Sequence, residues 1–532
     1  MSRSSAAPVW SEEHVARSDA VAAGERNSIM DSRWQNLSDP IFTHAHTRPD
    51  APALVDGPDA LTYRALAEFV AKASVYLCDL DIGQGERIGI ALGNSIDHVV
   101  LLFALLRIGA VPAELPADDS GEAIAAIAQR YGIRTVFTEP TKDLPAGITR
   151  HRVMADWRAT IARKNGDARC TAEGDSLELL NLTTGSTGTP SGVIWTHRKF
   201  LQRCEVRLGT YYPDGLGGNL PRDMLLTASM RYAWFFLVTV MQIFAGGRLV
   251  ILPSFAKPIE MVRTIASWKG AICCATANMC RLFLIAAPES DRLFPDLYAL
   301  EASGLPLFPW EKEAMIARVV ENFREGYGTA GIGAISVLLP ADMSQKPGSV
   351  GRPLPLLEVQ IVDDSGQPHP PGNYSAIRCR SPLLSRPCPE NGGGPRAEYF
   401  RGEWYHPGDI GMLDADGYLY LRGRVADIIR RAGHEVFAPD VEAAIVRHLL
   451  VAEAAVVGIP SPSVGEEVIA FVVKGGALEH DDLARHCQTV LAPAQRPDRI
   501  FYIAALPRLD AGKIDRARLQ SLALSEAVRR GG

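Results

Sequence analysis

A run of threonines, serines and glycines at residues 183–192, Thr-Thr-Gly-Ser-Thr-Gly-Thr-Pro-Ser-Gly, has the composition of a loop that can hold phosphate groups. Mostly apolar residues at 177–182 and 193–197 flank it, so the sequence predicts two strands joined by a glycine-rich hairpin loop. Glycines let backbone N–H groups approach a ligand and the hydroxyls add donors, which suits a polyphosphate. A solvated Ser/Thr/Gly loop is the alternative, and the run lacks the Gly-Lys-Ser/Thr ending of a Walker phosphate loop.

A carboxylate and a guanidinium follow much later in the chain. Residues 404–411, Trp-Tyr-His-Pro-Gly-Asp-Ile-Gly, contain Asp409, and a predicted short strand ends in Arg424. A carboxylate can accept hydrogen bonds from both ribose hydroxyls, and a guanidinium can donate to ribose or phosphate oxygens. The pair therefore suits a nucleotide, with a surface ion pair as the alternative.

Two further segments have glycine-rich or basic signals. Residues 326–331, Gly-Tyr-Gly-Thr-Ala-Gly, formally match the dinucleotide fingerprint Gly-x-Gly-x-x-Gly. We reject that interpretation because residues 320–325 are mixed and charged where a buried strand is required, and Pro340 shortens the segment that follows. Near the end of the chain, Lys513 lies in Asp-Ala-Gly-Lys-Ile-Asp. A solvated surface side chain is the usual interpretation of a lone lysine.

The elements that must position these residues alternate between helix and strand. Residues 61–77 have apolar residues at helical spacing with Thr62 as the cap, and a second apolar helix is expected at 99–108. Strands are expected at 87–92, 111–115 and 135–137. This alternation predicts an α/β fold with largely parallel sheets.

The motifs, in this order, resemble those of the adenylate-forming (AMP-binding) enzymes: acyl-coenzyme A synthetases, aryl-acid ligases, luciferases and the adenylation domains of peptide synthetases. Residues 61–67, 105–112 and 348–353 also resemble family segments, so the similarity extends from about residue 61 to 516. The resemblance implies a large multi-sheet α/β domain followed by a small mobile α+β domain. We expect a flexible leader at 1–36, the large domain at 37–423 and the small domain at 424–532.

The resemblance also implies a role for each matching residue. The expected ATP- and AMP-binding residues are Thr183, Thr184, Gly185, Ser186, Thr187, Gly188, Ser303, Gly304, Leu305, Pro306, Tyr327, Gly328, Thr329, Ala330, Asp409, Leu421 and Arg424. Lys513 resembles the catalytic lysine that stabilises charge on the carboxylate and the α-phosphate during adenylation. The expected acid pocket comprises Arg231, Tyr232, Ala233, Trp234 and Gly331, the thiol tunnel comprises Gly433 and His434, and the hinge is Ala426.

The acid itself is not determined by these residues. The rings of Tyr232 and Trp234 would give a largely apolar wall, although core packing is the alternative for each of them. Arg231 could contact a polar group of the acid or a neighbouring carboxylate.

Several residues depart from the family pattern. Ser191 replaces the lysine of the phosphate loop, Ala330 replaces a threonine that would contact the α-phosphate, and Ala426 replaces the usual Asp or Lys of the hinge. Gly331 replaces the glutamate that usually helps to hold magnesium. ATP, Mg²⁺ and coenzyme A are the implied cofactors and substrates, but the protein ligands of the metal stay unassigned.

Composition excludes several other classes. The 532 residues are 47% hydrophobic, enough for at least two domains, and a net charge of −6 gives no reason to expect a nucleic-acid partner. The nine cysteines contain no Cys-x-x-Cys pair and are interpreted as reduced core thiols of a cytoplasmic protein. Residues 1–36 lack the apolar core of a signal peptide. Residues 234–253 are expected to form a helix, a turn and a strand, not a membrane span.

Together these features predict that ATP and a carboxylic acid form an acyl adenylate and pyrophosphate. Coenzyme A is the expected acceptor in the second step, and loading of a separate carrier protein is the alternative. A chain that binds nucleotide or acyl ligand without turnover is the alternative from another class, because of the departures at Ser191, Ala330 and Gly331. A homodimer is possible.

Overall fold

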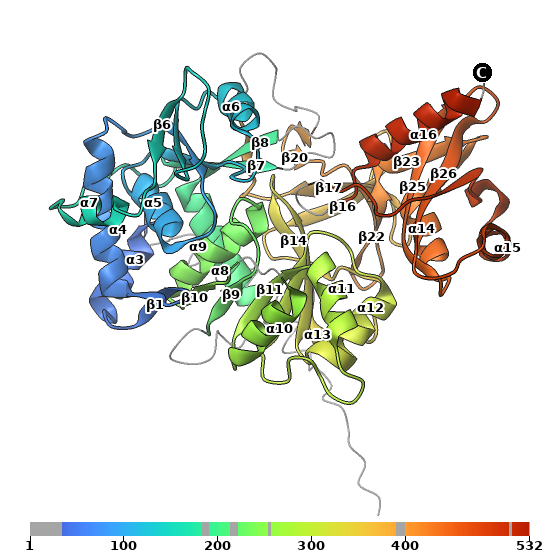
Figure 1. Cartoon of the computed structure of the whole chain (residues 1–532), viewed down its shortest axis with the longest axis horizontal. Coiled ribbons are helices and arrows are strands. Elements are labelled where there is room, and N and C mark those ends of the chain that lie inside the picture. The colour runs from blue at the N-terminus through green and yellow to red at the C-terminus, as the bar shows by residue number, and fades with distance from the viewer. Residues whose placement is uncertain are drawn as a thin grey trace, which may run out of the picture.

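The computed structural model describes residues 34–183, 191–212, 222–253, 257–389, 399–509 and 513–530. Within them, strands form four sheets, and the elements after β22 gather at one end of the molecule, orange to red in Figure 1. Packed structure begins slightly before the predicted end of the leader, because the side-chain amide of Asn36 is buried and donates to the carbonyl of Leu106 at 2.7 Å.

The largest sheet has the order β15-β14-β13-β12-β11-β9-β10-β1-β2 among the described residues. Its central pairs, from β13 to β1, are parallel, whereas β14, β15 and β2 are antiparallel edge strands. Its strands are β1 (Pro52–Asp56), β2 (Asp59–Thr62), β9 (Met224–Leu226), β10 (Leu249–Ile251), β11 (Ile272–Thr276), β12 (Ala299–Ser303), β13 (Phe323–Thr329), β14 (Gly333–Leu338) and β15 (Arg352–Pro353).

A second sheet has the order β18-β8-β7-β4-β3-β5-β6 and is parallel from β7 to β6. Its strands are β3 (Arg87–Ala91), β4 (Val111–Glu114), β5 (Thr135–Thr138), β6 (Thr149–Arg152), β7 (Glu178–Thr183), β8 (Ser191–Thr196) and β18 (Arg386–Pro387). The antiparallel pair β7–β8 is the hairpin expected around the phosphate loop. The loop itself, residues 184–190, lies outside the described residues.

Helices fill the space between these two sheets and cover their outer faces. A shared hydrophobic core includes residues of α3, α4, α5, α8 and α9 together with strands of both sheets. The described helices of this part are α3 (Asp39–Thr47), α4 (Tyr63–Cys78), α5 (Ile96–Arg107), α6 (Gly121–Arg130), α7 (Trp157–Ala162), α8 (His197–Tyr211), α9 (Ala233–Ala245), α10 (Pro258–Ser267), α11 (Ala277–Ala286), α12 (Pro309–Ala314), the adjoining π-helix (Met315–Val319) and α13 (Pro340–Met343).

Two antiparallel sheets complete the chain. One contains β16 (Glu358–Val362), β17 (Ser375–Arg380), β19 (Phe400–Arg401), β20 (Trp404–Tyr405), β21 (Asp409–Leu413) and β22 (Leu419–Arg424). The terminal sheet contains β23 (Ile428–Arg431), β24 (His434–Phe437), β25 (Val451–Ser461), β26 (Gly465–Lys474) and β27 (Arg499–Tyr502), of which β27 is parallel to β26. Helices α14 (Ala438–Val446), α15 (His480–Val490) and α16 (Arg516–Arg530) accompany this sheet.

Local sequence signals explain where several helices begin and end. The hydroxyl of Thr62 accepts a hydrogen bond from the N–H of Ala65 and caps α4, as expected. Helix α9 ends at Gly246, whose φ of +73° allows the turn into β10. Residues 234–253 therefore form the predicted helix, turn and strand. Among the described residues, no helix is long and apolar enough to cross a membrane.

The structure corrects two expectations. Residues 323–325 do form a buried strand, because their charged groups have partners: Glu325 contacts the Lys312 ammonium, and Arg324 donates to the Asn322 side chain and to the Tyr211 carbonyl. The dinucleotide interpretation still fails, since the glycine segment lies in the antiparallel hairpin β13–β14 and no helix follows it. All nine cysteines are free, but Cys78 at the end of α4 is exposed and is not a core thiol.

Candidate active site

Asp409 lies at the centre of the candidate site. It begins β21 and is directly opposite Arg424, the last residue of β22, in the antiparallel pair. The guanidinium Nε of Arg424 is 3.2 Å from Oδ1 of Asp409, and the Tyr327 hydroxyl donates to Oδ2 at 2.6 Å. A buried carboxylate is thus fixed by one guanidinium and one phenol, which are predicted nucleotide-binding residues from two different sheets.

Lys513 faces the same carboxylate from the terminal part of the chain. The N–H of Leu509 donates to the Lys513 carbonyl at 2.8 Å, and Arg508 forms a bridge with Ile514, so these backbone contacts hold residues 513 and 514 beside residues 508 and 509. Burial, together with the positive charge of Arg424, lowers the pKa of Lys513, whereas Asp409 opposes this change. The structure therefore places an ammonium group within electrostatic reach of the predicted ribose-binding pair.

The electrostatics of Asp409 and Tyr327 reflect burial. Burial raises the pKa of Asp409, while Arg424, the Tyr327 hydrogen bond and Lys513 lower it. The pKa of Tyr327 is raised well above its usual value by burial and by the neighbouring carboxylate. Tyr327 consequently stays a neutral phenol, and its hydroxyl donates a hydrogen bond to Asp409.

The segment after Tyr327 contacts Tyr405, a residue that sequence reasoning did not include in the site. The Thr329 hydroxyl donates to the Tyr405 hydroxyl at 3.2 Å. A Cβ atom added at Gly331 would overlap the Tyr405 ring, so a glutamate at this position does not fit while the ring is there. Tyr405 lies in the same motif as Asp409, at residues 404–411. This closeness in the sequence is the signal that could have identified Tyr405 as a site residue.

Within the described residues, the candidate site has no cluster of carboxylates that could hold a magnesium ion by itself. Magnesium prefers oxygen ligands, commonly carboxylates. Position 331 has no side chain, and in the parts of the chain that the structure describes no group of three or more His, Cys, Asp or Glu residues could hold a metal. We therefore assign no catalytic step to a protein-bound metal.

The predicted nucleotide-binding segment at residues 303–306 lies beside this cluster. Ser303 ends β12 opposite Gly326 of β13, so the chain leaves the sheet next to Tyr327. Gly304 has a φ of +103°, a conformation that favours glycine and turns the backbone sharply at this edge. Leu305 and Pro306 follow, and the Pro306 carbonyl accepts a hydrogen bond from Arg281 at 3.4 Å.

The predicted acid-pocket residues of the loop before α9 lie together at its start. Tyr232 is the N-cap residue, Ala233 begins the helix, and the Arg231 guanidinium lies 5.2 Å from the Tyr232 ring centroid. Trp234 packs against the main core and against Phe235. The aromatic side chains therefore serve at least partly as core residues, which was the alternative interpretation.

Other predicted residues lie outside the cluster. Gly433 lies in the exposed turn between β23 and β24, exposed His434 begins β24, and Ala426 is exposed in the 3₁₀ turn Val425–Asp427. Leu421 is half-buried on β22 opposite Gly411. Thr183 ends β7, and the remaining phosphate-loop residues, Thr184 to Gly188, are not among the described residues.

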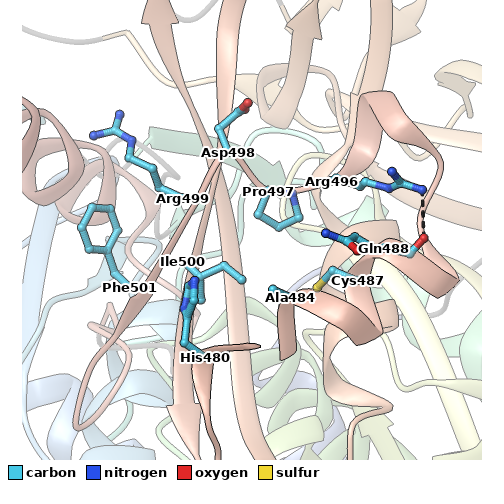
Figure 2. Close-up of a pocket in the computed structure, with 10 residues that line it drawn as sticks. All are labelled: His480, Ala484, Cys487, Gln488, Arg496, Pro497, Asp498, Arg499, Ile500 and Phe501. Carbon is cyan, nitrogen blue, oxygen red and sulfur yellow. Dashed lines mark hydrogen bonds between the residues drawn. The ribbon is translucent and has the colours of Figure 1, made fainter. Parts of the chain in front are cut away.

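A separate pocket lies between α15 and β27 (Figure 2). It is lined by His480, Ala484, Cys487, Gln488, Arg496, Pro497, Asp498, Arg499, Ile500 and Phe501, none of which is a predicted site residue. Arg496 donates to the backbone carbonyl of Gln488 at 2.9 Å, and Asp498 pairs with Arg431. The charged side chains of this pocket thus hold the terminal part of the chain together.

Residues 41–387 match the family described as AMP-binding enzyme, and residues 440–513 match the AMP-binding enzyme C-terminal domain. The chain belongs to the AMP-binding enzyme family. The resemblance inferred from the order of the motifs is confirmed, as is the predicted fold class.

Known proteins resemble this family member along most of its length. It is 27% identical to a long-chain-fatty-acid–CoA ligase of Salmonella typhimurium, covering 92% of this chain and 95% of the relative. It is 26% identical to an oxalate–CoA ligase of Arabidopsis thaliana, covering 92% and 98%. ATP-bound MatB from Rhodopseudomonas palustris has the same fold, with a TM-score of 0.82, 21% identity and coverage of 92% and 98%.

Proposed function

We propose that this AMP-binding enzyme is an acid–CoA ligase. A carboxylate oxygen of the acid attacks the α-phosphorus of ATP, and pyrophosphate leaves. The thiol of coenzyme A then attacks the acyl carbon of the adenylate, so that a thioester forms, AMP leaves with the carboxylate oxygen and the thiol proton is released. Family membership and the CoA ligases among the relatives support this reaction.

The observation that carries the proposal is the convergence of Asp409, Arg424 and Lys513. Asp409 would accept hydrogen bonds from the ribose hydroxyls while Arg424 holds it in place. Lys513, which faces the same pair, would offset the negative charge that develops on the carboxylate and the α-phosphate. Because a carboxylate and an ammonium from distant segments would otherwise be solvated, their shared burial supports a common ligand.

The second step needs the thiol to reach the same centre. We propose that the terminal part turns at Ala426, within residues 424–427, and brings Gly433 and His434 to the adenylate. One ion pair crosses this turn in the present arrangement, Arg422 with Asp440 at 2.8 Å. Both side chains are about one third exposed, and exposed pairs contribute only about 0–1 kcal/mol, so the pair opposes the motion weakly.

Two assays test the proposal. Exchange of labelled pyrophosphate into ATP that depends on an added acid measures the first step, and formation of a thioester with coenzyme A measures the second. Exchange with an acid but no thioester would favour a carrier protein as the acceptor. A purified protein that binds ATP but exchanges pyrophosphate with no acid tried would instead favour a binding protein without turnover.

Asp409→Ala is expected to weaken ATP binding by about 10- to 100-fold, because hydrogen bonds to a charged group contribute roughly 1.5–3 kcal/mol. Affinity for the acid should change much less. Isothermal titration with ATP and with the acid measures both effects. Asp416→Ala is the matched control, since Asp416 lies on the turn of the same hairpin and is mostly exposed. Equal losses of affinity for ATP and for the acid would contradict the ribose role.

The kcat/KM of adenylation is expected to fall as the pH rises. This decrease should occur at a lower pH than for a lysine with an ordinary pKa. Burial and Arg424 lower the pKa of Lys513, so its ammonium form, which is the active form, predominates below that pKa and is lost above it. Lys513→Arg should move the alkaline limb to higher pH, because a guanidinium stays protonated. A profile of kcat/KM against pH reports the free enzyme. An alkaline limb at the same pH in both proteins would show that another group titrates.

A further inference from the structure

Arg203, in the middle of α8, is a half-buried cation that stacks on aromatic side chains. Its guanidinium carbon is 3.7 Å from the ring centroid of Trp195 and 5.0 Å from that of Phe200. Stacking on aromatic faces is favourable for arginine, but it does not replace the hydrogen bonds that the guanidinium makes in water. The side chain therefore needs acceptors that these rings do not supply.

No carboxylate in the described part of the chain supplies them. Arg207, one turn along α8, is neutralised by the buried carboxylate of Glu301, and Arg203 has no equivalent ion pair or hydrogen bond among these residues. Glu205 is not the counter-ion, because burial alone raises its pKa, to about 7. Burial and the charge of Arg207 lower the pKa of Arg203 to about 9, so the guanidinium stays charged at neutral pH.

This unpaired charge lines a small cavity. The lining residues are Arg203, Val206, Arg207, Leu237, Ile332, Ala334, Leu354, Pro355, Leu357, Ser381 and Leu383. The cavity has a volume of about 30 Å³, which is space for a few water-sized groups. A cation that has no ion pair in the described ranges, in a largely apolar cavity of this size, fits a small anionic group and not a long hydrocarbon chain.

The cavity lies close to the predicted reaction centre. A Cβ atom at position 333 would overlap the Arg203 guanidinium, so Gly333, whose φ is +84°, allows the arginine to lie against the backbone. Gly333 pairs directly with Thr329, whose hydroxyl contacts Tyr405 beside the candidate nucleotide site. The Cα atoms of residues opposite each other in antiparallel strands are roughly 4.5–5.5 Å apart, so the Arg203 guanidinium lies one strand away from Thr329.

We infer that the acid activated by this enzyme carries a second anionic group, such as a carboxylate or sulfonate, and that Arg203 binds this group. The inference rests on the proposed ligase function. The reacting carboxylate lies on the Thr329 side of the β13–β14 hairpin, and the second group enters the cavity against Arg203. Short diacids are therefore the expected substrate class, and Arg203 determines specificity without taking part in bond formation.

The test compares acids matched in carbon skeleton: propanoate with malonate, and butanoate with succinate. Acid-dependent exchange of pyrophosphate into ATP gives kcat/KM for each acid. The better dianionic acid is expected to exceed its monoanionic partner by about tenfold or more, as a charged hydrogen-bonded contact would give. Arg203→Met should reduce this ratio by at least about tenfold, and Arg203→Lys should retain part of it.

Arg198→Met is the matched control, because Arg198 lies on the same helix but pairs with Asp175 and should leave the ratio unchanged. The inference is overturned if the monoanionic acids are preferred, or if Arg203→Met keeps the wild-type ratio. Should Arg203→Met fail to fold, the wild-type protein decides: with AMP present, a diacid must raise its Tm more than the matched monoacid. If no acid supports exchange, the ligase function itself fails, which is a different result.

Discussion

Lys513→Ala is expected to slow acyl-adenylate formation by about 10²–10³-fold, the usual effect of removing one group that stabilises transition-state charge. The Lys513 ammonium lies within electrostatic reach of Asp409 and Arg424. Because its proposed partner is charge that develops during the reaction, affinity for ATP should change much less than the rate. Acid-dependent pyrophosphate exchange measures the rate, and titration with ATP measures the affinity.

Two variants sharpen this prediction. Lys513→Arg keeps a positive charge and should retain more activity than Lys513→Ala. Arg508→Ala, on the same segment, removes a charge that pairs with Glu453 instead, and it should leave the rate close to that of the wild-type protein. If Lys513→Ala exchanges pyrophosphate at the wild-type rate, the lysine has no part in adenylation and the proposed role of this turn is wrong.

The second large effect is expected on the free energy of unfolding, when the buried Arg207–Glu301 ion pair is broken. Arg207 and Glu301 form an ion pair in which both side chains are about 1% exposed, and the Tyr212 hydroxyl also donates to Glu301. Arg207→Met would leave the Glu301 carboxylate buried without its cation, at a cost of about 3–5 kcal/mol in the free energy of unfolding. The expected result is a clear decrease in the urea midpoint measured by fluorescence or circular dichroism.

The double variant Arg207→Met with Glu301→Gln separates the effect of the Arg207–Glu301 ion pair from the effect of side-chain packing. Since it removes both charges, it should be more stable than Arg207→Met alone. Arg64→Met is the control, because the Arg64–Asp50 pair is largely exposed and contributes about 0–1 kcal/mol. A double variant that is less stable than Arg207→Met would mean that the polar packing of Glu301, and not its charge, is what the fold requires.

Much of the fold follows from short-range signals in the sequence. Thr62 caps α4 and Gly246 ends α9 because capping and left-handed turns depend on a few neighbouring atoms. The alternation of apolar strands and helices predicted the parallel sheets, because a helix that follows each strand returns the chain to the same edge of the sheet. The buried strand at residues 323–325 was not predicted, because its charges are compatible with burial only when Lys312 and the Tyr211 carbonyl are brought beside it.

The candidate site also has features that the sequence predicted and features that only the folded structure revealed. The sequence by itself determined the family, the order of the motifs and the identity of Asp409, Arg424 and Lys513 as candidate residues, since these depend on residue types and spacing. Only the tertiary structure decided that the Tyr405 ring fills the space beside Gly331, and that Arg203 lines a cavity with no counter-ion among the described residues. Both facts depend on side chains from distant segments, whose packing and charge pairing are fixed only when the chain has folded.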